Sequence, residues 1–584
     1  MRKSSKKRGN SNESRKHWRI SALVLFVFCL SAILLGRLAF LQGMRANVYA
    51  TIADEQRNVS QSLPSDRGEV YLRDGGDLYP AAVNREYFLA YAVPADVGDP
   101  GRAARDIGSI LGLSETFLLD KFSKKSDPFE ILKRRLSDEE RDRIREANIP
   151  GIALLPEVYR YYPGQSIASQ TIGFVGMKED MFEGRYGIEA SFEEMLRGTH
   201  GEISGERDAA GRWIPLGGRE FQSPIHGATL VLTLERVFQY EAEKILKEAI
   251  EEFHADSGTI LVLDPETGSI LALASFPGFD PNEYSKVEQP ELFLNPALSF
   301  SYEPGSIMKP ITMAIGIEDG KVNASTEYVD TGVVVEGGYA IRNAEEKVYG
   351  KSSMTKVLEE SINTGVIYVE RLVGNVRFRT YFERFGFGEP TGIRLPAEAS
   401  GNIKNLGNAK RSIEFFTASF GQGITVTPLQ MANAYAALAN DGVLMRPRIV
   451  DRFIFPDGRV EDVRPEEMRS VVSEVTAREV GKMLRSVVVK GHGKRADVPG
   501  YSVVGKTGTA QVAKRNEKGY EEGMNIGSFV GYAPLEDPKF VVLVKIDNPK
   551  DVVWAESSAA PTFGKMMKFL LESSGIRPTL QNAH

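Results

Sequence analysis

Ser306 and Lys309 form a pair whose residue types and spacing suggest covalent chemistry. A serine hydroxyl is a weak nucleophile until a neighbouring base removes its proton. A lysine can be that base only where burial or nearby positive charge lowers its pKa from about 10.4. Three positions apart on a helix, the two side chains lie on one face. The pair predicts an activated serine, although S-x-x-K also arises by chance as a capping serine beside a solvated lysine.

Two further polar segments follow this pair along the chain. Ser361 and Asn363 flank Ile362, so a hydroxyl that can relay a proton stands close to a carboxamide that can orient a substrate amide. Later, 506–509 reads Lys-Thr-Gly-Thr, with a cation, two hydroxyls and a glycine that lets a substrate backbone approach. Alone, the first segment could be a helix end and the second an edge strand. The order S-x-x-K, S-x-N, K-T-G is much more specific than any one of them.

The elements around these residues can be predicted from local patterns. Pro304 and Gly305 interrupt the preceding segment, and the apolar pattern ITMAIGI at 311–317 predicts a helix that begins near Ser306. A helical run at 354–360 leads to Ser361, whereas 501–511 is strand-like. The nucleophile is therefore expected at a helix start, and the K-T-G segment is expected on a strand.

The wider sequence predicts a sheet covered by helices in its C-terminal part. A strand-like run at 229–235 precedes a helical pattern at 241–253, and two apolar runs at 258–264 and 269–275 flank the turn Pro-Glu-Thr-Gly. Before this module, residues 43–225 mix short strand-like runs with charged helical stretches. This mixture of short strands and helices predicts an irregular α+β domain.

An apolar run without charges extends from 20 to 35 and continues to 41 if Arg37 snorkels outward. Eight lysines and arginines precede it against Glu13 alone, so the positive-inside rule places the short tail in the cytoplasm and the rest outside. A cleaved signal peptide is the alternative. The run is long for that role, and no A-x-A-like site directly follows it.

Several other classes of protein fit the sequence poorly. The net charge of -6 gives no reason to expect nucleic acid, and the single cysteine, Cys29, excludes disulfides within the chain. Without an H-E-x-x-H pair a zinc hydrolase lacks ligands, and no metal or organic cofactor is expected. Residues 500–507 match the P-loop pattern, but a polar glycine-rich stretch precedes them and Gly508-Thr509 is a poor helix start. An ATPase is therefore disfavoured.

Taken together, these motifs resemble those of class B penicillin-binding proteins, and the likeness extends from the anchor to about Phe563. Ile362 departs from the S-D-N form of the middle motif, at a position where this family is tolerant. The resemblance implies a single transmembrane helix, an α+β pedestal and an α/β penicilloyl-serine transferase domain whose antiparallel sheet is covered by helices. Supporting segments are DRG at 66–68, YGIE at 186–189, FDPN at 279–282, SFGQG at 419–423 with TPLQ at 427–430, and AAP at 559–561.

The resemblance also implies a role for each motif residue. The reaction would be D,D-transpeptidation of peptidoglycan stem peptides, with β-lactams as inhibitors. Ser306 would be the nucleophile, Lys309 the base and Ser361 the proton relay. Asn363 would hold the substrate amide, and Lys506 with Thr507 would hold the terminal carboxylate. Gly508 would admit the substrate backbone, and the N–H groups of Ser306 and Thr509 would form the oxyanion hole.

The predicted organisation has a cytoplasmic tail at 1–19, an anchor at 20–42, a pedestal at 43–225, a transpeptidase domain at 226–575 and a tail at 576–584. The enzyme is expected in the plasma membrane, with its catalytic domain outside. Expected partners are stem peptides of lipid-linked nascent glycan, a membrane glycan polymerase of the SEDS family and divisome proteins, but no nucleic acid. A septal, division-type enzyme is favoured over an elongation-type enzyme or a non-enzymatic β-lactam sensor or scaffold.

Overall fold

The computed structural model describes residues 13–47, 58–178, 181–206, 220–514 and 519–578. By their internal contacts the residues divide into two units. The first takes its residues from 1–65 and 199–225, and the second from 66–198 and 226–584. The three motifs predicted to be catalytic all lie in the second unit.

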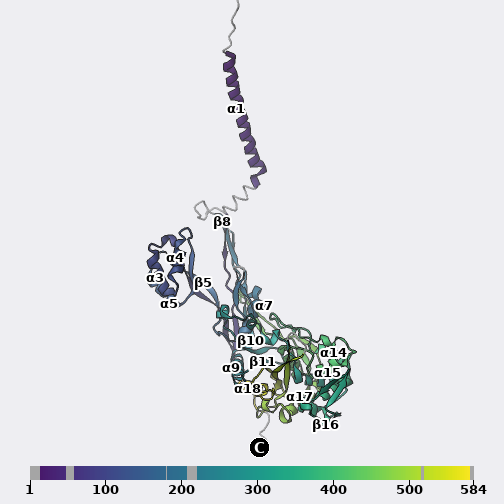
Figure 1. The fold of residues 1–584 in the computed structure, drawn as a ribbon. Helices are drawn as coiled ribbons and strands as arrows, with labels where there is room; N and C mark the ends of the chain where they lie inside the picture. Colours follow the sequence, from purple (N-terminus) through teal and green to yellow (C-terminus); the bar gives the residue numbers. More distant parts are fainter. Residues whose placement is uncertain (1–12, 48–57, 179–180, 207–219, 515–518, 579–584) are drawn as a thin grey trace, which may run out of the picture. The chain divides into compact units, whose positions relative to one another are not determined.

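The first unit contains one long apolar helix and a small sheet (Figure 1). Helix α1 (Glu13–Ala39) continues into a π-helical turn, η1 (Phe40–Met44). Within the segment Trp18–Met44, an 18-residue window has a mean hydropathy of 2.5, and the large apolar side chains are exposed. At about 1.5 Å per residue, these 27 residues are long enough to cross a hydrocarbon core of about 30 Å. The sheet pairs β8 (Gly201–Glu206) antiparallel with β1 (Asn58–Leu63) and β9 (Glu220–Gln222).

The N-terminal part of the second unit is built on a seven-stranded sheet in the order β19-β18-β10-β2-β3-β4, with β5 also paired to β3. Helices α3, α4 and α5 gather beside β4 and β5 in one lobe, around a core that includes Ile107 and Phe122 (Figure 1). The elements are β2 (Val70–Asp74), β3 (Asp77–Ala92), η2 (Pro94–Asp96), α3 (Pro100–Leu111), α4 (Glu115–Ser123), β4 (Glu130–Leu136), α5 (Asp138–Ala147), β5 (Ile152–Tyr161), α6 (Ser169–Ile172), β6 (Val175–Lys178), β7 (Met181–Gly184), α7 (Gly187–Ser191), α8 (Glu193–Arg197), β10 (Thr229–Glu235), β18 (Val450–Ile454) and β19 (Val460–Asp462).

A buried ion network ties this region together. Glu189 is fully buried, and its two carboxylate oxygens lie 2.6 Å from Arg160 and 2.6 Å from Arg67. Burial alone would raise the pKa of Glu189, but the two arginines outweigh burial and hold that pKa below its usual value. The DRG segment thus supplies Arg67 and the YGIE segment supplies Glu189 to one ion pair.

The second sheet has five antiparallel strands in the order β12-β11-β23-β22-β21. Side chains alternate between its faces: Ile260 and Val262 of β11 (Ser257–Leu263) join one core, whereas Leu261 and Leu263 join another. Helices α9 (Arg236–Glu252) and α18 (Ala559–Ser573) cover the first face, and the helices that follow the nucleophile segment cover the second. The predicted antiparallel sheet with helices on both sides is confirmed.

The remaining elements surround this sheet. They are β12 (Ile270–Phe276), η3 (Pro281–Lys286), η4 (Pro290–Phe293), α10 (Pro296–Ser299), η5 (Gly305–Met308), α11 (Lys309–Glu318), β13 (Glu327–Asp330), β14 (Val333–Glu336), β15 (Tyr339–Arg342), η6 (Ala344–Glu346), β16 (Gly350–Ser353), α12 (Met354–Glu359), α13 (Asn363–Val373), α14 (Asn375–Arg384), η7 (Lys404–Gly407), α15 (Ser412–Ser419), α16 (Pro428–Ala439), β17 (Val443–Met445), β20 (Glu467–Ser470), α17 (Glu474–Lys490), η8 (Lys494–Ala496), β21 (Val504–Ala513), β22 (Tyr520–Ala533) and β23 (Phe540–Asp547).

Candidate active site

Ser306 lies in the short 3-10 turn η5, directly before α11, as the sequence predicts. Gly305 has a φ of 60°, a conformation that suits glycine, and its N–H donates to the carbonyl of Gly421 at 3.0 Å. The buried Tyr435 hydroxyl donates to the carbonyl of Ile307 at 2.8 Å. Contacts on both sides of the serine therefore fix the backbone that carries it.

Lys309 begins α11 and is completely buried. Its ammonium group donates to the Ser361 hydroxyl at 3.1 Å and also to the Ser361 carbonyl. Ser361 stands between α12 and α13 with a φ of 56°, in the left-handed region that non-glycine residues rarely adopt. Such a conformation persists only where its surroundings hold it, and it directs both oxygens of Ser361 at the lysine.

Two buried lysines set the electrostatics of the site. Burial, and then the charge of Lys506, hold the pKa of Lys309 well below its usual value. Burial also lowers the pKa of Lys506 to about 7, although Glu556 opposes that shift. Both lysines can therefore exist without a proton at neutral pH, which an exposed lysine does not do.

Strand β21 carries the K-T-G segment along the edge of the five-stranded sheet. The Lys506 ammonium donates to the Thr507 carbonyl at 3.2 Å and to the Thr507 hydroxyl at 3.3 Å. A Cβ atom on Gly508 would lie 2.9 Å from both the Pro304 carbonyl oxygen and a methyl group of Ile307. Only glycine at this position allows β21 to pack so closely on the nucleophile turn.

A cleft of about 1070 Å³ opens at this point. Ser306, Ser361, Asn363, Thr507 and Thr509 line it, whereas Lys309 and Lys506 are buried. The structure thus brings the three predicted motifs to one place. The Asn363 side chain donates to the Arg342 carbonyl at 2.9 Å, and the Thr509 hydroxyl accepts from the N–H of Ala555 at 3.1 Å.

Sequence motifs did not identify much of the cleft wall. Phe420 and Gln422 belong to the SFGQG segment, so a signal for them existed in the family likeness. His492 and Glu556 also line the cleft, with their side chains 3.1 Å apart, but no motif in the sequence pointed to either residue. The same holds for Glu360, Trp554 and the start of β22 at 520–525.

The P-loop interpretation of 500–507 is wrong. Lys506 and Thr507 lie inside β21, and the strand continues to Ala513 where a P-loop requires a helix. Among the described residues, no group of three or more His, Cys, Asp or Glu side chains is arranged to hold a metal ion.

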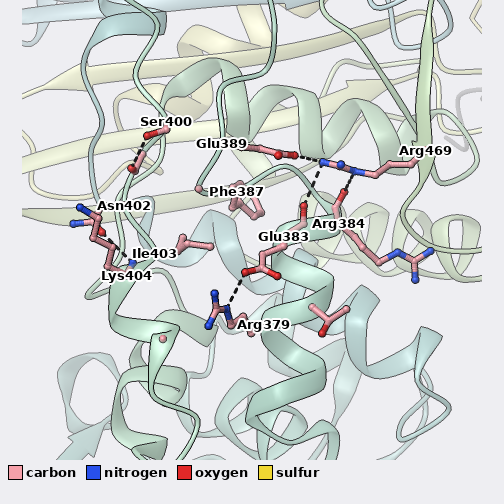
Figure 2. A pocket seen from close by; sticks show the side chains of 14 residues that line it. Arg379, Glu383, Arg384, Phe387, Glu389, Ser400, Asn402, Ile403, Lys404 and Arg469 are labelled. Atoms are coloured by element: carbon pink, nitrogen blue, oxygen red, sulfur yellow. Dashed lines mark hydrogen bonds and ion pairs between the residues drawn. The ribbon is translucent and has the colours of Figure 1, made fainter.

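A second cavity, of about 760 Å³, lies against α14 (Figure 2). Arg379 pairs with Glu383 at 2.8 Å, and Arg469 bonds to Glu389 and to the Arg384 carbonyl. These side chains and carbonyls satisfy one another, and the cavity holds none of the motif residues. It is therefore distinct from the catalytic cleft.

Comparison with known sequences and structures identifies the class of this fold and site. The family described as penicillin binding protein transpeptidase domain matches residues 258–568, and the penicillin-binding protein dimerisation domain matches residues 62–232. The chain belongs to the penicillin-binding protein transpeptidase family.

Individual relatives resemble the chain over nearly its whole length. Stage V sporulation protein D of Bacillus subtilis is 31% identical, over 96% of this chain and 86% of that protein. The peptidoglycan D,D-transpeptidase FtsI homolog of Mesostigma viride is 29% identical, over 96% of this chain and 97% of that protein. Penicillin binding protein 3 of Mycobacterium tuberculosis, solved as a complex with aztreonam, superimposes with a TM-score of 0.68 at 27% identity, covering 90% of this chain and 100% of that one.

Proposed function

We propose that this transpeptidase cross-links peptidoglycan stem peptides through an acyl-enzyme on Ser306. One observation carries the proposal: Lys309 is buried below the cleft that Ser306 lines, with its pKa held well below the usual value and its ammonium group bonded to Ser361. Because its pKa is lowered, Lys309 can lose a proton at neutral pH; the neutral amine can then accept the Ser306 proton, and Ser361 can pass the proton on.

Acylation would proceed at the end of a donor stem peptide. Lys309 takes the Ser306 proton, and Oγ attacks the carbonyl of the penultimate D-Ala. The C–N bond to the terminal D-Ala then breaks, and the proton reaches the leaving amine through Ser361. An ester between Ser306 and the shortened stem remains.

An amine from a second stem peptide would resolve this ester. The amine attacks the ester carbonyl, the C–O bond to Ser306 breaks, and the amine proton returns through Lys309 to the serine oxygen. The products are a new amide cross-link and free enzyme, so no outside energy source is consumed.

Binding groups on the opposite strand support both steps. Lys506 and Thr507 would hold the carboxylate of the terminal D-Ala, which in turn would stabilise the charged form of Lys506 whose pKa is about 7 without substrate. Asn363 would hold the substrate amide, and Gly508 would admit its backbone. The N–H groups of Ser306 and Thr509 would stabilise the tetrahedral oxyanion, at about 3 kcal/mol each.

We also propose an orientation and an organisation for the chain. The basic residues before the apolar run favour a cytoplasmic N-terminus, which would put the cleft outside with the nascent glycan. The boundaries at 19/20, 42/43, 225/226 and 575/576 are part of the same proposal. The partners would be a SEDS-family glycan polymerase and divisome proteins, approached through the anchor and pedestal.

Within the class, we propose a role in septal synthesis. The SFGQG and ITVTPLQ segments support it, and one relative is named an FtsI homolog. Depletion of a septal enzyme should give filamentous cells, whereas rounded cells would indicate the elongation role. Exchange of residues 20–42 for a neutral membrane span should weaken complementation, and normal growth after the exchange would contradict recruitment through the anchor.

The acylation proposal can be tested with a fluorescent penicillin on the detergent-solubilised full chain. Wild type should carry a stable adduct by denaturing gel and intact mass, Ser306→Ala none, and Lys309→Ala much less. An unlabelled but folded wild type would contradict the nucleophile assignment.

Labelling alone does not separate an enzyme from a β-lactam sensor. The second measurement therefore uses a donor stem peptide and an acceptor amine, with mass spectrometry of the products. Wild type should form the cross-linked peptide and release D-Ala in equal amounts. Penicillin labelling without either product would favour the sensor or scaffold.

A further inference from the structure

Glu303 stands three residues before Ser306 and joins three segments that line the cleft. One carboxylate oxygen accepts the backbone N–H of Gly423 at 2.9 Å. The other accepts the hydroxyl of Tyr520 at 3.1 Å. The first contact spans 120 residues of sequence and the second 217, so neither is a local turn contact.

Each partner belongs to a different wall. Gly423 follows Phe420 and Gln422, which line the cleft on the turn after α15. Tyr520 opens β22 opposite Ala513 of β21, beyond a bulge, and residues 520–525 line the cleft as well. Glu303 itself belongs to the segment that carries the nucleophile. One carboxylate therefore fixes the spacing between the serine and two walls on which none of the predicted catalytic motifs lies.

Packing around the nucleophile leaves little freedom for this arrangement. A Cβ atom on Gly421 would lie 2.3 Å from the Gly305 carbonyl oxygen, and the Asn405 side chain donates to the Gly423 carbonyl at 2.7 Å. The turn at 421–423 thus packs closely against the nucleophile segment, and the hydrogen bond from Asn405 also holds it in place. Tyr520 pairs with Ala513 at the far end of β21, beyond the bulge, and its bond to Glu303 ties that end of the sheet to the nucleophile segment.

The protonation states of Glu303 and Tyr520 favour the hydrogen bond between them at neutral pH. Burial raises the pKa of Glu303, and the donors from Gly423 and Tyr520 offset part of that effect. Burial also raises the pKa of Tyr520, and with the nearby carboxylate of Glu303 the pKa reaches about 12. The phenol therefore keeps its proton and donates it, while Glu303 accepts two bonds at once.

We infer that Glu303 is a positioning residue for acylation: it holds the start of β22 and the 421–423 turn at fixed positions relative to Ser306. The inference rests on the proposed acylation of Ser306. Glu303 does not touch the reacting atoms; its effect passes through the geometry of the walls that receive the substrate. Displacements of about 1 Å in such walls can cost a hundredfold in rate.

The test compares second-order rate constants for acylation by a fluorescent penicillin in the full chain. Glu303→Ala should lower the rate constant about tenfold or more, because it releases both walls. Glu303→Gln should stay within about threefold of wild type, because its amide oxygen can accept from the Gly423 N–H while its NH2 group donates to the Tyr520 hydroxyl oxygen, which keeps both links. Glu291→Ala, at an exposed glutamate on η4, is the matched control and should match wild type.

A double-mutant cycle distinguishes positioning from general loss of stability. Tyr520→Phe should lower the rate constant by itself but add little in the Glu303→Ala background, because both substitutions remove the same Tyr520–Glu303 bond. The melting temperature of each protein is measured in parallel, and rates are compared well below it. Additive effects of the two substitutions, or a wild-type rate in folded Glu303→Ala, would overturn the inference. If wild type itself is not acylated, the proposed function fails, which is a separate result.

Discussion

Glu370 is a fully buried carboxyl group on α13, and neither of its oxygens has a hydrogen-bond partner among the described residues. Burial raises its pKa to about 8, with Arg371 opposing and Glu336 reinforcing that shift. In the unfolded chain the same group has a pKa of 4.5. The folded protein therefore keeps a proton at neutral pH that the unfolded chain releases.

This difference makes stability depend on pH with a definite sign. Because the folded pKa is the higher one, stability is fully present below pH 4.5 and is lost as the pH rises through about 8. The whole interval corresponds to about 5 kcal/mol, and about 3 kcal/mol of it is already lost at pH 7. Glu370→Gln removes the proton equilibrium but keeps the size and polarity of the side chain. We expect it to match wild type near pH 4.5 and to exceed it increasingly towards pH 8.

The assay is thermal unfolding of the solubilised full chain between pH 5 and pH 8.5, read as the difference in melting temperature between Glu370→Gln and wild type. That difference should be close to zero at pH 5 and reach several degrees at pH 8. Glu283→Gln is the control, since Glu283 is an exposed partner of Lys286. A difference that stays constant across the range, or a variant less stable at pH 8, would refute the reasoning.

Three further substitutions have directions that the structure fixes. Lys506→Met should move the acid limb of the acylation pH profile to higher pH, because the charge of Lys506 helps to lower the pKa of Lys309; an unmoved limb would count against that coupling. Gly508→Ala should slow penicillin labelling severely, whereas Gly407→Ala, with no atom within 4 Å of the added methyl, should not; equal labelling would contradict the close packing of β21. Glu189→Gln should lower the free energy of unfolding by about 3–5 kcal/mol by leaving the buried Arg160 and the partly buried Arg67 without their shared carboxylate, and a much smaller loss in denaturant would show that the network is not desolvated.

The parts of the site that the sequence predicted are those determined by neighbouring residues. Pro304 and Gly305 break one element and an apolar pattern starts the next, so Ser306 at a helix start follows from local rules. Apolar runs on both sides of a turn likewise predict strands at 258–264 and 269–275, and these segments form β11 and β12. Local propensity and tertiary structure agree in these segments.

Contacts over long sequence distances were beyond that reasoning. Glu303 is an ordinary glutamate until Tyr520 and Gly423 are brought to it by the pairing of β21 with β22 and by the turn after α15. Glu370 sits in a helix whose pattern does not mark it, and its unpaired burial depends on how α13 packs on α11 and α15. No pattern in a single sequence contains this information, because it arises from the fold as a whole.

The S-x-x-K pair shows why the same residues are chemically inert elsewhere. On an exposed helix, Lys309 would stay charged in water, and Ser306 would have no base. Here the sheet and the helices over it exclude water from the lysine, Lys506 adds a second positive charge nearby, and Ser361 accepts its hydrogen bonds. Burying an amine in this way costs folding free energy, and that cost is what lowers its pKa into the range of a general base. The motif therefore names the groups that we propose to react, while desolvation by residues from distant parts of the chain lowers the pKa of the proposed base.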